Sequence, residues 1–329
     1  MLFIDNKGIT DPRINLAIEE YAVKQLNIEE SYLLFYINEP SIIIGKNQNT
    51  IEEINVDYIE DNNIHVVRRL SGGGAVYHDL GNLNFSFITK DDGDSFHNFR
   101  KFTEPVVTAL NKLGLNAEMS GRNDLTANGF KISGNAQFST KGRMFTHGTL
   151  LFDTNMNDVV AALKVRKDKI ESKGIKSIRS RVANISDLIE QKMSIAEFKQ
   201  FILKNIFSSE EQIDEYVLTE ADWKAIHQIS AERYGNWDWN YGKSPAFNIE
   251  RSHRFPVGLI DIRLHVKGGE ISTARVFGDF FGAGDVAEVE QTLIGTKYEK
   301  EAIRSALEPL DMKHYFGAVT TEELIELIY

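Results

Sequence analysis

An α+β fold with a main domain and a smaller C-terminal domain is predicted by three observations. Short apolar runs typical of strands come in groups, with helical segments on one side of them, and do not alternate with helices as βαβ units would. The chain has 329 residues, which is enough for two domains. The aromatic segment 237–245 then interrupts the pattern. We therefore expect one domain over residues 1–244 and another over residues 245–329.

The first helix is predicted to begin at Asp11-Pro12. Aspartate is a favoured N-cap residue, and proline suits the first position of a helix. Apolar side chains then recur at helical spacing, at Ile14, Ile18, Tyr21 and Leu26. We expect an amphipathic helix packed against a sheet.

The next elements are predicted to be strands. Segments 32–37 and 41–45 are short apolar runs, and Asn38-Glu39-Pro40 between them is typical of a turn, so we expect a hairpin of buried strands. The other expected elements of the main domain are helices over 55–62, 95–113 and parts of 194–229, and strands over 65–67, 83–88, 124–136 and 146–152.

The C-terminal third is predicted to be a small α+β unit. Apolar residues alternate with polar ones at Ile260, Ile262, Leu264 and Val266, and a Gly-Gly turn leads into a second run over 271–277. This pattern indicates a β-hairpin with one buried face. Helical patterns follow near 286–294 and 300–307.

Composition excludes several classes of function. Lys and Arg total 37 and Asp and Glu total 48, so the net charge is −11, which argues against nucleic acid as a general partner. The chain contains no cysteine, so it has no disulfide, thiolate metal site or cysteine nucleophile. It shows neither a secretory signal pattern nor a run of eighteen apolar residues. We expect a cytoplasmic protein without membrane segments.

Two glycine-rich turns predict an anion-binding site. One occurs in Arg68-Arg69-Leu70-Ser71-Gly72-Gly73-Gly74-Ala75-Val76-Tyr77-His78-Asp79, and the other in Gly129-Phe130-Lys131-Ile132-Ser133-Gly134-Asn135-Ala136. Successive glycines let main-chain N–H groups approach a negatively charged ligand. Arginine forks match carboxylate or phosphate oxygens, and a lysine adds a movable point charge.

A flexible loop is the alternative reading of the three glycines. Strand patterns on both sides favour a loop held at each end. A P-loop is excluded because no Gly-Lys-Ser/Thr follows the glycines, and a dinucleotide fingerprint is disfavoured because the glycines are contiguous and no helix pattern opens after them.

A basic segment covers residues 164–181. It holds eight Lys or Arg residues against two acidic ones, a local charge of 8 − 2 = +6. Such a run is typical of a solvated loop, and it is also suited to a lid over a polyanionic intermediate.

At these residues the chain resembles the lipoate–protein ligase A family. The resemblance rests on both glycine-rich signatures and on four more blocks in the same order, and it covers nearly the whole chain. It implies a catalytic domain of the biotin/lipoate protein ligase-like fold, related to class II aminoacyl-tRNA synthetases, and a small C-terminal accessory domain. Biotin ligases share the fold but have a different arginine-glycine loop. The four further blocks are Asp11-Pro12-Arg13-Ile14-Asn15-Leu16-Ala17-Ile18-Glu19-Glu20, Pro40-Ser41-Ile42-Ile43-Ile44-Gly45-Lys46-Asn47-Gln48-Asn49, Gly121-Arg122-Asn123-Asp124-Leu125 and Thr146-His147-Gly148-Thr149-Leu150-Leu151.

The resemblance implies an ATP-dependent ligase. Such an enzyme activates lipoate to lipoyl-AMP with release of pyrophosphate, and then acylates a lysine of an acceptor protein. The implied acceptors are lipoyl domains of 2-oxoacid dehydrogenase E2 subunits and the glycine-cleavage H protein. ATP, Mg²⁺ and lipoate are the implied small molecules.

The resemblance also implies site residues. Lys131 is the expected catalytic residue, set between carboxyl oxygen and α-phosphate, and Asp124 is a candidate ligand for Mg²⁺. His78 and His147 are either general bases or hydrogen-bonded scaffold residues, and Arg68 is a candidate for a structural role. The expected contacts to ATP or lipoyl-AMP are Arg69, Gly74, Ala75, Val76, Tyr77 and Lys131, with Ser71, His78, Asn123, His147, Lys176 and Arg179 as further candidates. The aliphatic chain of lipoate requires an apolar pocket, for which Leu16, Leu70, Val76 and Leu150 are candidates that core packing explains equally well.

Two rival functions remain. Relatives of the same fold transfer lipoyl or octanoyl groups between proteins through a cysteine, which this chain lacks. The other rival is a non-catalytic protein that binds a lipoyl nucleotide, against which the intact Lys131, Arg69 and glycine loop argue.

Overall fold

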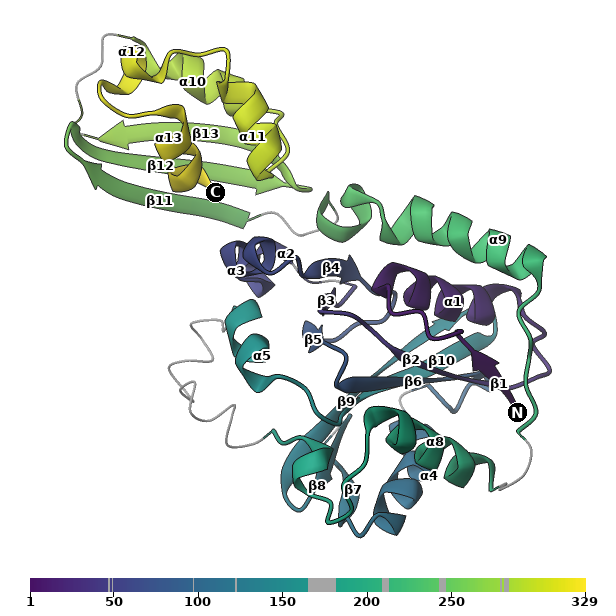
Figure 1. The fold of residues 1–329 in the computed structure, drawn as a ribbon. Helices are drawn as coiled ribbons and strands as arrows, with labels where there is room; N and C mark the ends of the chain where they lie inside the picture. The colour runs from purple at the N-terminus through teal and green to yellow at the C-terminus, as the bar shows by residue number, and fades with distance from the viewer. Residues whose placement is uncertain are drawn as a thin grey trace. The chain divides into compact units, whose positions relative to one another are not determined.

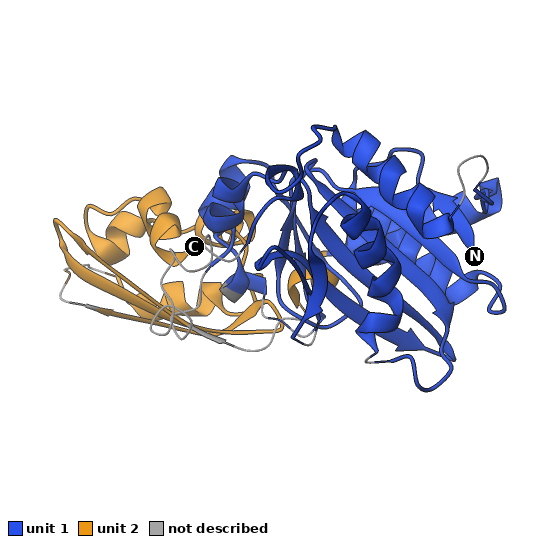
Figure 2. Ribbon diagram, turned by 90° about the horizontal axis from the view of Figure 1, so that it is seen from below, with its two compact units in different colours: residues 1–236 blue, residues 237–329 orange. Residues whose placement is uncertain are grey.

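The computed structural model divides into two compact units, residues 1–236 and 237–329 (Figure 2). The expected domain boundary at 244/245 falls on residues 243–246, outside the described part of the chain. The structure describes residues 1–46, 48, 50–96, 98–121, 123–164, 182–208, 213–242, 247–278, 280 and 284–329.

The first unit is built on a seven-stranded sheet (Figure 1). β1 runs parallel to β2, and every other neighbouring pair is antiparallel. The strand order is β1 (Leu2–Asp5), β2 (Tyr32–Ile37), β6 (Asn82–Lys90), β10 (Arg143–Leu151), β9 (Phe130–Thr140), β8 (Asp124–Ala127) and β7 (Ala117–Ser120).

Helices cover both faces of this sheet, which corrects the expectation of helices on one side (Figure 1). The α4 (Phe99–Lys112) and α8 (Ile195–Phe207) helices lie on one face. The α1 (Pro12–Gln25) and α9 (Glu220–Ile229) helices lie on the other. Strand β6 accounts for this arrangement, because it is buried almost throughout its length and therefore needs cover on both faces.

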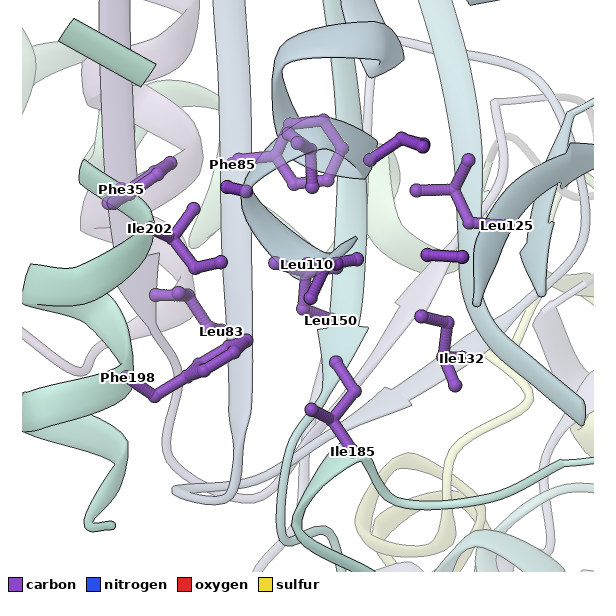
Figure 3. Packing of buried hydrophobic residues seen from close by; sticks show 14 of the residues in the cluster. Phe35, Leu83, Phe85, Leu110, Leu125, Ile132, Leu150, Ile185, Phe198 and Ile202 are labelled. Atoms are coloured by element: carbon purple, nitrogen blue, oxygen red, sulfur yellow. The ribbon is translucent and has the colours of Figure 1, made fainter. Parts of the chain in front are cut away.

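The apolar core lies between the sheet and the α4 and α8 helices (Figure 3). Burying an aliphatic or aromatic side chain of this kind stabilises the fold by about 1.5–3 kcal/mol. On the opposite face β6 carries the buried polar residues Asn82, Asn84 and Ser86. The core includes Phe35, Leu83, Phe85, Leu110, Leu125, Ile132, Leu150, Ile185, Phe198 and Ile202.

A second, three-stranded sheet holds the glycine loop. Its order is β4 (His65–Arg68), β3 (Ser41–Ile44) and β5 (Val76–His78), with β3 parallel to β4 and antiparallel to β5. The predicted hairpin of residues 32–37 and 41–45 is therefore wrong. Strand β2 pairs with β1 and β6, and the chain leaves the large sheet before β3 begins. Both strands are apolar on both faces, so their pattern did not specify a partner.

The α1 helix starts as predicted, with the Asp11 side chain accepting a hydrogen bond from the Arg13 N–H and Pro12 in the first turn. It is not the simple amphipathic helix that was expected. Asn15, Glu19 and Glu20 are buried as well, because α9 and η2 (Ser230–Tyr234) pack against α1 from the side away from the sheet.

Shorter elements complete the first unit. The predicted helix over 55–62 is confirmed as α3, and the predicted helix over 95–113 is confirmed as the shorter α4. Among the described residues, no helix combines the length and apolar character needed to cross a membrane. The remaining elements are α2 (Thr50–Glu53), α3 (Val56–Asp61), α5 (Met156–Ala162) and η1 (Ile185–Asp187).

The second unit is a three-stranded antiparallel sheet with helices on one face. The predicted hairpin is confirmed as β12 (Gly258–Lys267) and β13 (Glu270–Gly278), and β11 (Phe247–Phe255) adds an edge strand to it. The alternating apolar residues of β12 are buried beneath the helices. The other elements are η3 (Asp238–Gly242), α10 (Val286–Leu293), α11 (Lys300–Leu307), α12 (Met312–Phe316) and α13 (Thr321–Ile328).

Replacing Arg68 with methionine is expected to lower the free energy of unfolding by about 3 kcal/mol or more, because several neutral acceptors lose their donor together. The Arg68 guanidinium is fully buried and donates hydrogen bonds to the carbonyl oxygens of Gly45 at 3.0 Å, Lys46 at 3.1 Å and Gln48 at 2.7 Å, and to Thr50 Oγ1 at 2.8 Å. Each buried acceptor left without a donor costs about 1–3 kcal/mol.

Urea unfolding measures this loss. The control is Arg13→Met, which removes a half-exposed ion pair with Asp11 and is expected to change stability by less than about 1 kcal/mol. Equal stabilities of the two variants would contradict the structural role of Arg68.

Candidate active site

A pocket of about 190 Å³ lies in the first unit where its two sheets meet. The helix α1, five strands of the large sheet (β2, β6, β8, β9 and β10) and the small sheet all contribute residues to its lining. The glycine loop, residues 72–74, forms part of the wall. The lining residues are Leu16, Tyr36, Ile43, Arg69, Gly73, Gly74, Ala75, Val76, His78, Asn84, Asn123, Asp124, Lys131, Gly134, Asn135, Ala136, His147, Gly148 and Thr149.

Within the glycine loop, only Gly73 adopts a conformation that favours glycine. Its φ is +98°, and a Cβ atom there would lie 2.9 Å from Arg69 Nη2. At Gly72 and Gly74 a Cβ atom would meet no atom of the described residues within 4 Å. Gly45 follows β3, and its own Cβ would overlap the Gly73 carbonyl oxygen. The loop is therefore packed closely onto the end of the small sheet.

Arg69 holds the glycine loop in place through hydrogen bonds to the loop and to β3. Its Nε donates to Ser71 Oγ at 3.0 Å, and its Nη2 donates to the carbonyl oxygens of Gly72 at 2.7 Å and Gly74 at 2.8 Å. Nη1 donates to the Ile43 carbonyl oxygen at 3.0 Å, which ties the loop to β3. Burial lowers the pKa of Arg69 to about 10, so the guanidinium remains charged at neutral pH. Arg69 thus combines a permanent charge at the pocket wall with the structural support of the loop.

Lys131 and Asp124 form an ion pair at the pocket wall. Lys131 Nζ lies 2.8 Å from Asp124 Oδ1, and both side chains are more than a third exposed. Water can reach this pair, which weakens the attraction between the charges and lets Lys131 exchange its partner for an anionic ligand. The two residues come from the adjacent strands β9 and β8.

The described residues on the two sides of the basic segment bond to different elements, α2 on one side and β9 on the other. On one side the Lys164 N–H donates to the Glu53 carbonyl oxygen at 3.0 Å, and on the other the Ala183 N–H donates to the Lys131 carbonyl oxygen at 3.1 Å. Lys176 and Arg179, which were predicted as candidate contacts, lie outside the described residues.

A buried hydrogen-bond chain connects the loop to α1. His147 Nδ1 lies 3.0 Å from Glu19 Oε1, and His147 Nε2 lies 2.8 Å from Ser71 Oγ. A carboxylate only accepts hydrogen bonds, so Nδ1 carries a proton. The spacing resembles a Ser-His-acid triad, but Ser71 does not line the pocket and its Oγ also accepts from Arg69. The chain supports the loop and sets the orientation of His147.

Other sequence-predicted residues have different surroundings. Tyr77 does not line the pocket, and its hydroxyl donates to Asp158 Oδ2 at 3.4 Å. Burial and the Asp158 carboxylate raise the pKa of Tyr77. Asn123 lines the pocket and ties β8 to β9, with its Nδ2 donating to the Asn135 carbonyl oxygen at 2.7 Å.

Of the four residues predicted as candidates for an apolar pocket, two line the pocket and two do not. Leu16 and Val76 line the pocket, whereas Leu150 belongs to the core cluster and Leu70 is buried away from the pocket lining. Sequence reasoning did not single out Tyr36, Ile43, Asn84 or Glu19. Glu19 occurs in a block that the resemblance quoted, but its contact with His147 spans 128 residues of sequence and no local pattern indicates it.

Replacing Gly73 with alanine is expected to lower the free energy of unfolding by about 1–3 kcal/mol, because a positive φ strains an L-residue and the new Cβ displaces Arg69. Gly72→Ala is the matched control in the same loop, and it is expected to stay within about 0.5 kcal/mol of the unchanged protein. Urea unfolding of both variants checks this. If Gly72→Ala costs as much as Gly73→Ala, the described loop conformation is wrong.

The chain is similar to known families over most of its length. Residues 11–207 match the family described as Lipoyl protein ligase A/B catalytic domain. Residues 244–328 match Bacterial lipoate protein ligase C-terminus. Lipoate-protein ligase LplJ of Bacillus subtilis is 66% identical to the chain over 331 residues, which cover 100% of both proteins.

Two solved structures are similar to about three quarters of the chain. One is a bi-partite lipoate protein ligase from Thermoplasma acidophilum, described with its E2 lipoyl domain. It has a TM-score of 0.65, 33% identity and coverage of 74% of this chain and 96% of that chain. The other is a lipoate-protein ligase A bound with ATP, with a TM-score of 0.63, 30% identity and coverage of 74% and 98%.

Proposed function

The chain belongs to the lipoyl protein ligase A/B family and is an ATP-dependent lipoate–protein ligase, and from this premise we propose how its pocket performs the reaction. The observation that carries the proposal is the Lys131–Asp124 pair, with Nζ and Oδ1 2.8 Å apart, on a pocket that the glycine loop also lines. A mobile cation and a close-packed backbone loop together suit a ligand with crowded negative charge.

The first step activates lipoate. A carboxylate oxygen of lipoate attacks the α-phosphorus of ATP, the bond from that phosphorus to the bridging oxygen breaks, and pyrophosphate leaves with the bond electrons. The product is the mixed anhydride lipoyl-AMP. Two anionic groups must approach each other in this step, and Lys131 Nζ, set between them, offsets their repulsion.

The second step transfers the lipoyl group. The amine nitrogen of an acceptor lysine attacks the acyl carbon, the bond from that carbon to the phosphate oxygen breaks, AMP leaves, and water takes the proton from nitrogen. Negative charge develops on the acyl oxygen during attack, and Lys131 stabilises it. The same ammonium group therefore serves both steps.

Asp124 is the residue that we propose as a ligand for Mg²⁺. One of its oxygens pairs with Lys131, and the other has no hydrogen-bond or ion-pair partner within the described ranges. In those ranges no three His, Asp or Glu side chains cluster as a metal site. This donor set fits Mg²⁺, which is commonly held by one or two carboxylates while substrate phosphates and water complete its shell. When bound, Mg²⁺ neutralises phosphate charge.

The other proposed ligands form the pocket walls. Leu16, Ile43 and Val76 supply apolar surface for the hydrocarbon chain of lipoate. Gly74 and Ala75 bring the backbone close to the nucleotide, and Arg69 keeps the loop in that position. His147 acts as a scaffold residue through its bonds to Glu19 and Ser71.

The acceptors that we propose are lipoyl domains of 2-oxoacid dehydrogenase E2 subunits and the glycine-cleavage H protein. A structural relative is described with its E2 lipoyl domain, which supports the first of these. The requirement for ATP favours the cytoplasm as the place of action. The net charge of −11 argues against nucleic acid as a further partner.

Release of pyrophosphate together with formation of lipoyl-AMP tests activation directly. With lipoate and ATP–Mg²⁺ but no acceptor, we expect pyrophosphate release and bound lipoyl-AMP in about equal amounts. Adding an acceptor domain then gives repeated turnover. Release of pyrophosphate that does not depend on lipoate contradicts the proposal. Binding of lipoyl-AMP without its formation favours the non-catalytic alternative, and transfer from an acylated protein alone favours the transferase.

A further inference from the structure

In the described part of the chain, one buried ring nitrogen of the pocket is left without a hydrogen-bond partner. His78, at the end of β5, lines the pocket and is almost completely buried. Its Nδ1 lies 3.0 Å from Asn38 Nδ2, whereas its Nε2 has no hydrogen-bond partner among the described residues. A buried polar atom without a partner is costly in a folded protein, unless a ligand or water completes it.

A chain of asparagine side chains determines which nitrogen of His78 carries the proton. Asn6 Nδ2 donates to the Ile9 carbonyl oxygen and to Asn15 Oδ1, both at 2.9 Å. Asn15 Nδ2 donates to the same Ile9 oxygen and to Asn38 Oδ1, again at 2.9 Å. Carbonyl oxygens only accept hydrogen bonds, so the Ile9 oxygen fixes the orientation of the first two amides.

The orientation of Asn38 follows from that of Asn15. Turning the Asn38 amide over would place its NH₂ group against the NH₂ group of Asn15, which leaves two donors facing each other. Asn38 therefore presents Nδ2 to His78, and Nδ1 of the ring must accept. A neutral imidazole that accepts at Nδ1 carries its proton at Nε2.

The surroundings keep the ring neutral. Burial, followed by the nearby Arg69 and His147, lowers the pKa of His78 to about 3. Neither nitrogen can act as a general base, because one lone pair is occupied by Asn38 and the other nitrogen bears a proton. This removes His78 from the candidates for proton abstraction. The ring therefore offers the pocket a single neutral N–H donor, near the permanently charged guanidinium of Arg69. This position suits a ligand oxygen that only accepts hydrogen bonds.

We propose that His78 is a substrate-binding residue, locked by Asn38 as the Nε2–H tautomer, whose Nε2 donates a hydrogen bond to a carboxylate oxygen of lipoate or an α-phosphate oxygen of ATP. This inference rests on the proposed ligase function and adds a residue to it. Asn38, Asn15 and Asn6 are positioning residues that act through the ring.

The tautomer is tested on the unaltered protein. Two-bond ¹H–¹⁵N spectra of histidine-labelled protein distinguish a nitrogen that carries a proton from one that does not, and the spectrum of His78→Gln identifies the His78 signals by their loss. We expect Nε2 to be protonated and Nδ1 to be unprotonated from pH 8 to pH 5. A proton on Nδ1, or a ring that becomes charged within this range, overturns the proposal.

The contact with substrate is tested by two variants that remove the ring. The amide nitrogen of His78→Gln reaches the place of Nε2, whereas the shorter side chain of His78→Asn does not. Calorimetry measures binding of lipoate alone and of ATP alone. Loss of one hydrogen bond of about 1 kcal/mol weakens binding about fivefold, so we expect this loss for His78→Asn and near-normal binding for His78→Gln.

The two binding measurements identify the oxygen. Weaker binding of lipoate assigns the contact to its carboxylate, and weaker binding of ATP assigns it to the α-phosphate. Unchanged binding of both substrates by both variants overturns the proposal, as does equal weakening by Gln and Asn, which indicates a purely steric role. Failure of the unaltered protein to form lipoyl-AMP is a separate result, because it contradicts the ligase function itself.

Discussion

Lys131→Ala is expected to lower the rate of lipoyl-AMP formation, and that of lipoyl transfer, each by about a hundredfold or more. The variant loses the movable cation that faces the approaching anions in the first step and the acyl oxygen in the second. Single-turnover experiments separate the two rates, with ATP and lipoate for activation and with supplied lipoyl-AMP for transfer.

The control for this variant is Lys192→Ala, which removes an exposed lysine outside the pocket and should leave both rates unchanged. A Lys131→Ala protein that is slow in activation but normal in transfer would remove the second role of Lys131. Normal rates in both steps would contradict the proposed catalytic role of this residue altogether.

Arg69→Lys is expected to be about as damaging to activation as Arg69→Met, with losses of about a hundredfold. The guanidinium holds the loop through four hydrogen bonds directed at Ser71, Gly72, Gly74 and Ile43. Lysine keeps the charge but lacks the planar fork that reaches these acceptors together. Displacing the loop by about 1 Å is sufficient to cause a loss of this size.

Lipoyl-AMP formation by the two Arg69 variants is measured at a temperature where circular dichroism shows both to be folded. If charge alone matters, Arg69→Lys retains most of the activity and Arg69→Met does not. That result would contradict the account in which Arg69 acts mainly through the shape of the loop.

Local sequence patterns predicted the elements whose signals are self-contained. The Asp11-Pro12 start of α1 depends on one capping side chain and one ring, and the structure confirms it. The strand predicted from the alternation over residues 260–266 is confirmed as β12, because one face of this strand is buried and the other is not. In these places local preference and tertiary environment agree.

The sequence-based predictions were wrong where contacts between distant parts of the chain determine the structure. Strands β2 and β3 are both buried on two faces, so their sequences do not reveal that they belong to different sheets. The burial of Glu19 and Glu20 on α1 depends on partners far along the chain, namely His147 for the first and Arg233 for the second. The prediction from helical spacing considered only apolar side chains, so it did not include these buried glutamates.

The site was predicted only in part, because some of its features depend on local sequence and others on long-range contacts. Glycine and lysine signatures indicated the loop and Lys131, because those residues act through intrinsic conformation and charge. The support of the loop by Arg69, and the asparagine chain from Asn6 to His78, depend on distances that no motif contains. The role of a side-chain amide in particular cannot be predicted from sequence, because an amide both donates and accepts hydrogen bonds and its role depends on its partners.

The measurement that tests the central claim most directly is the intact mass of an apo lipoyl acceptor domain after incubation with this protein, lipoate and Mg²⁺, with and without ATP. We expect a gain of one lipoyl group on one lysine, dependent on ATP and absent with Lys131→Ala. An unmodified domain in the presence of ATP, with modification only when lipoyl-AMP or an acylated donor protein is supplied, would contradict the account and indicate a transferase.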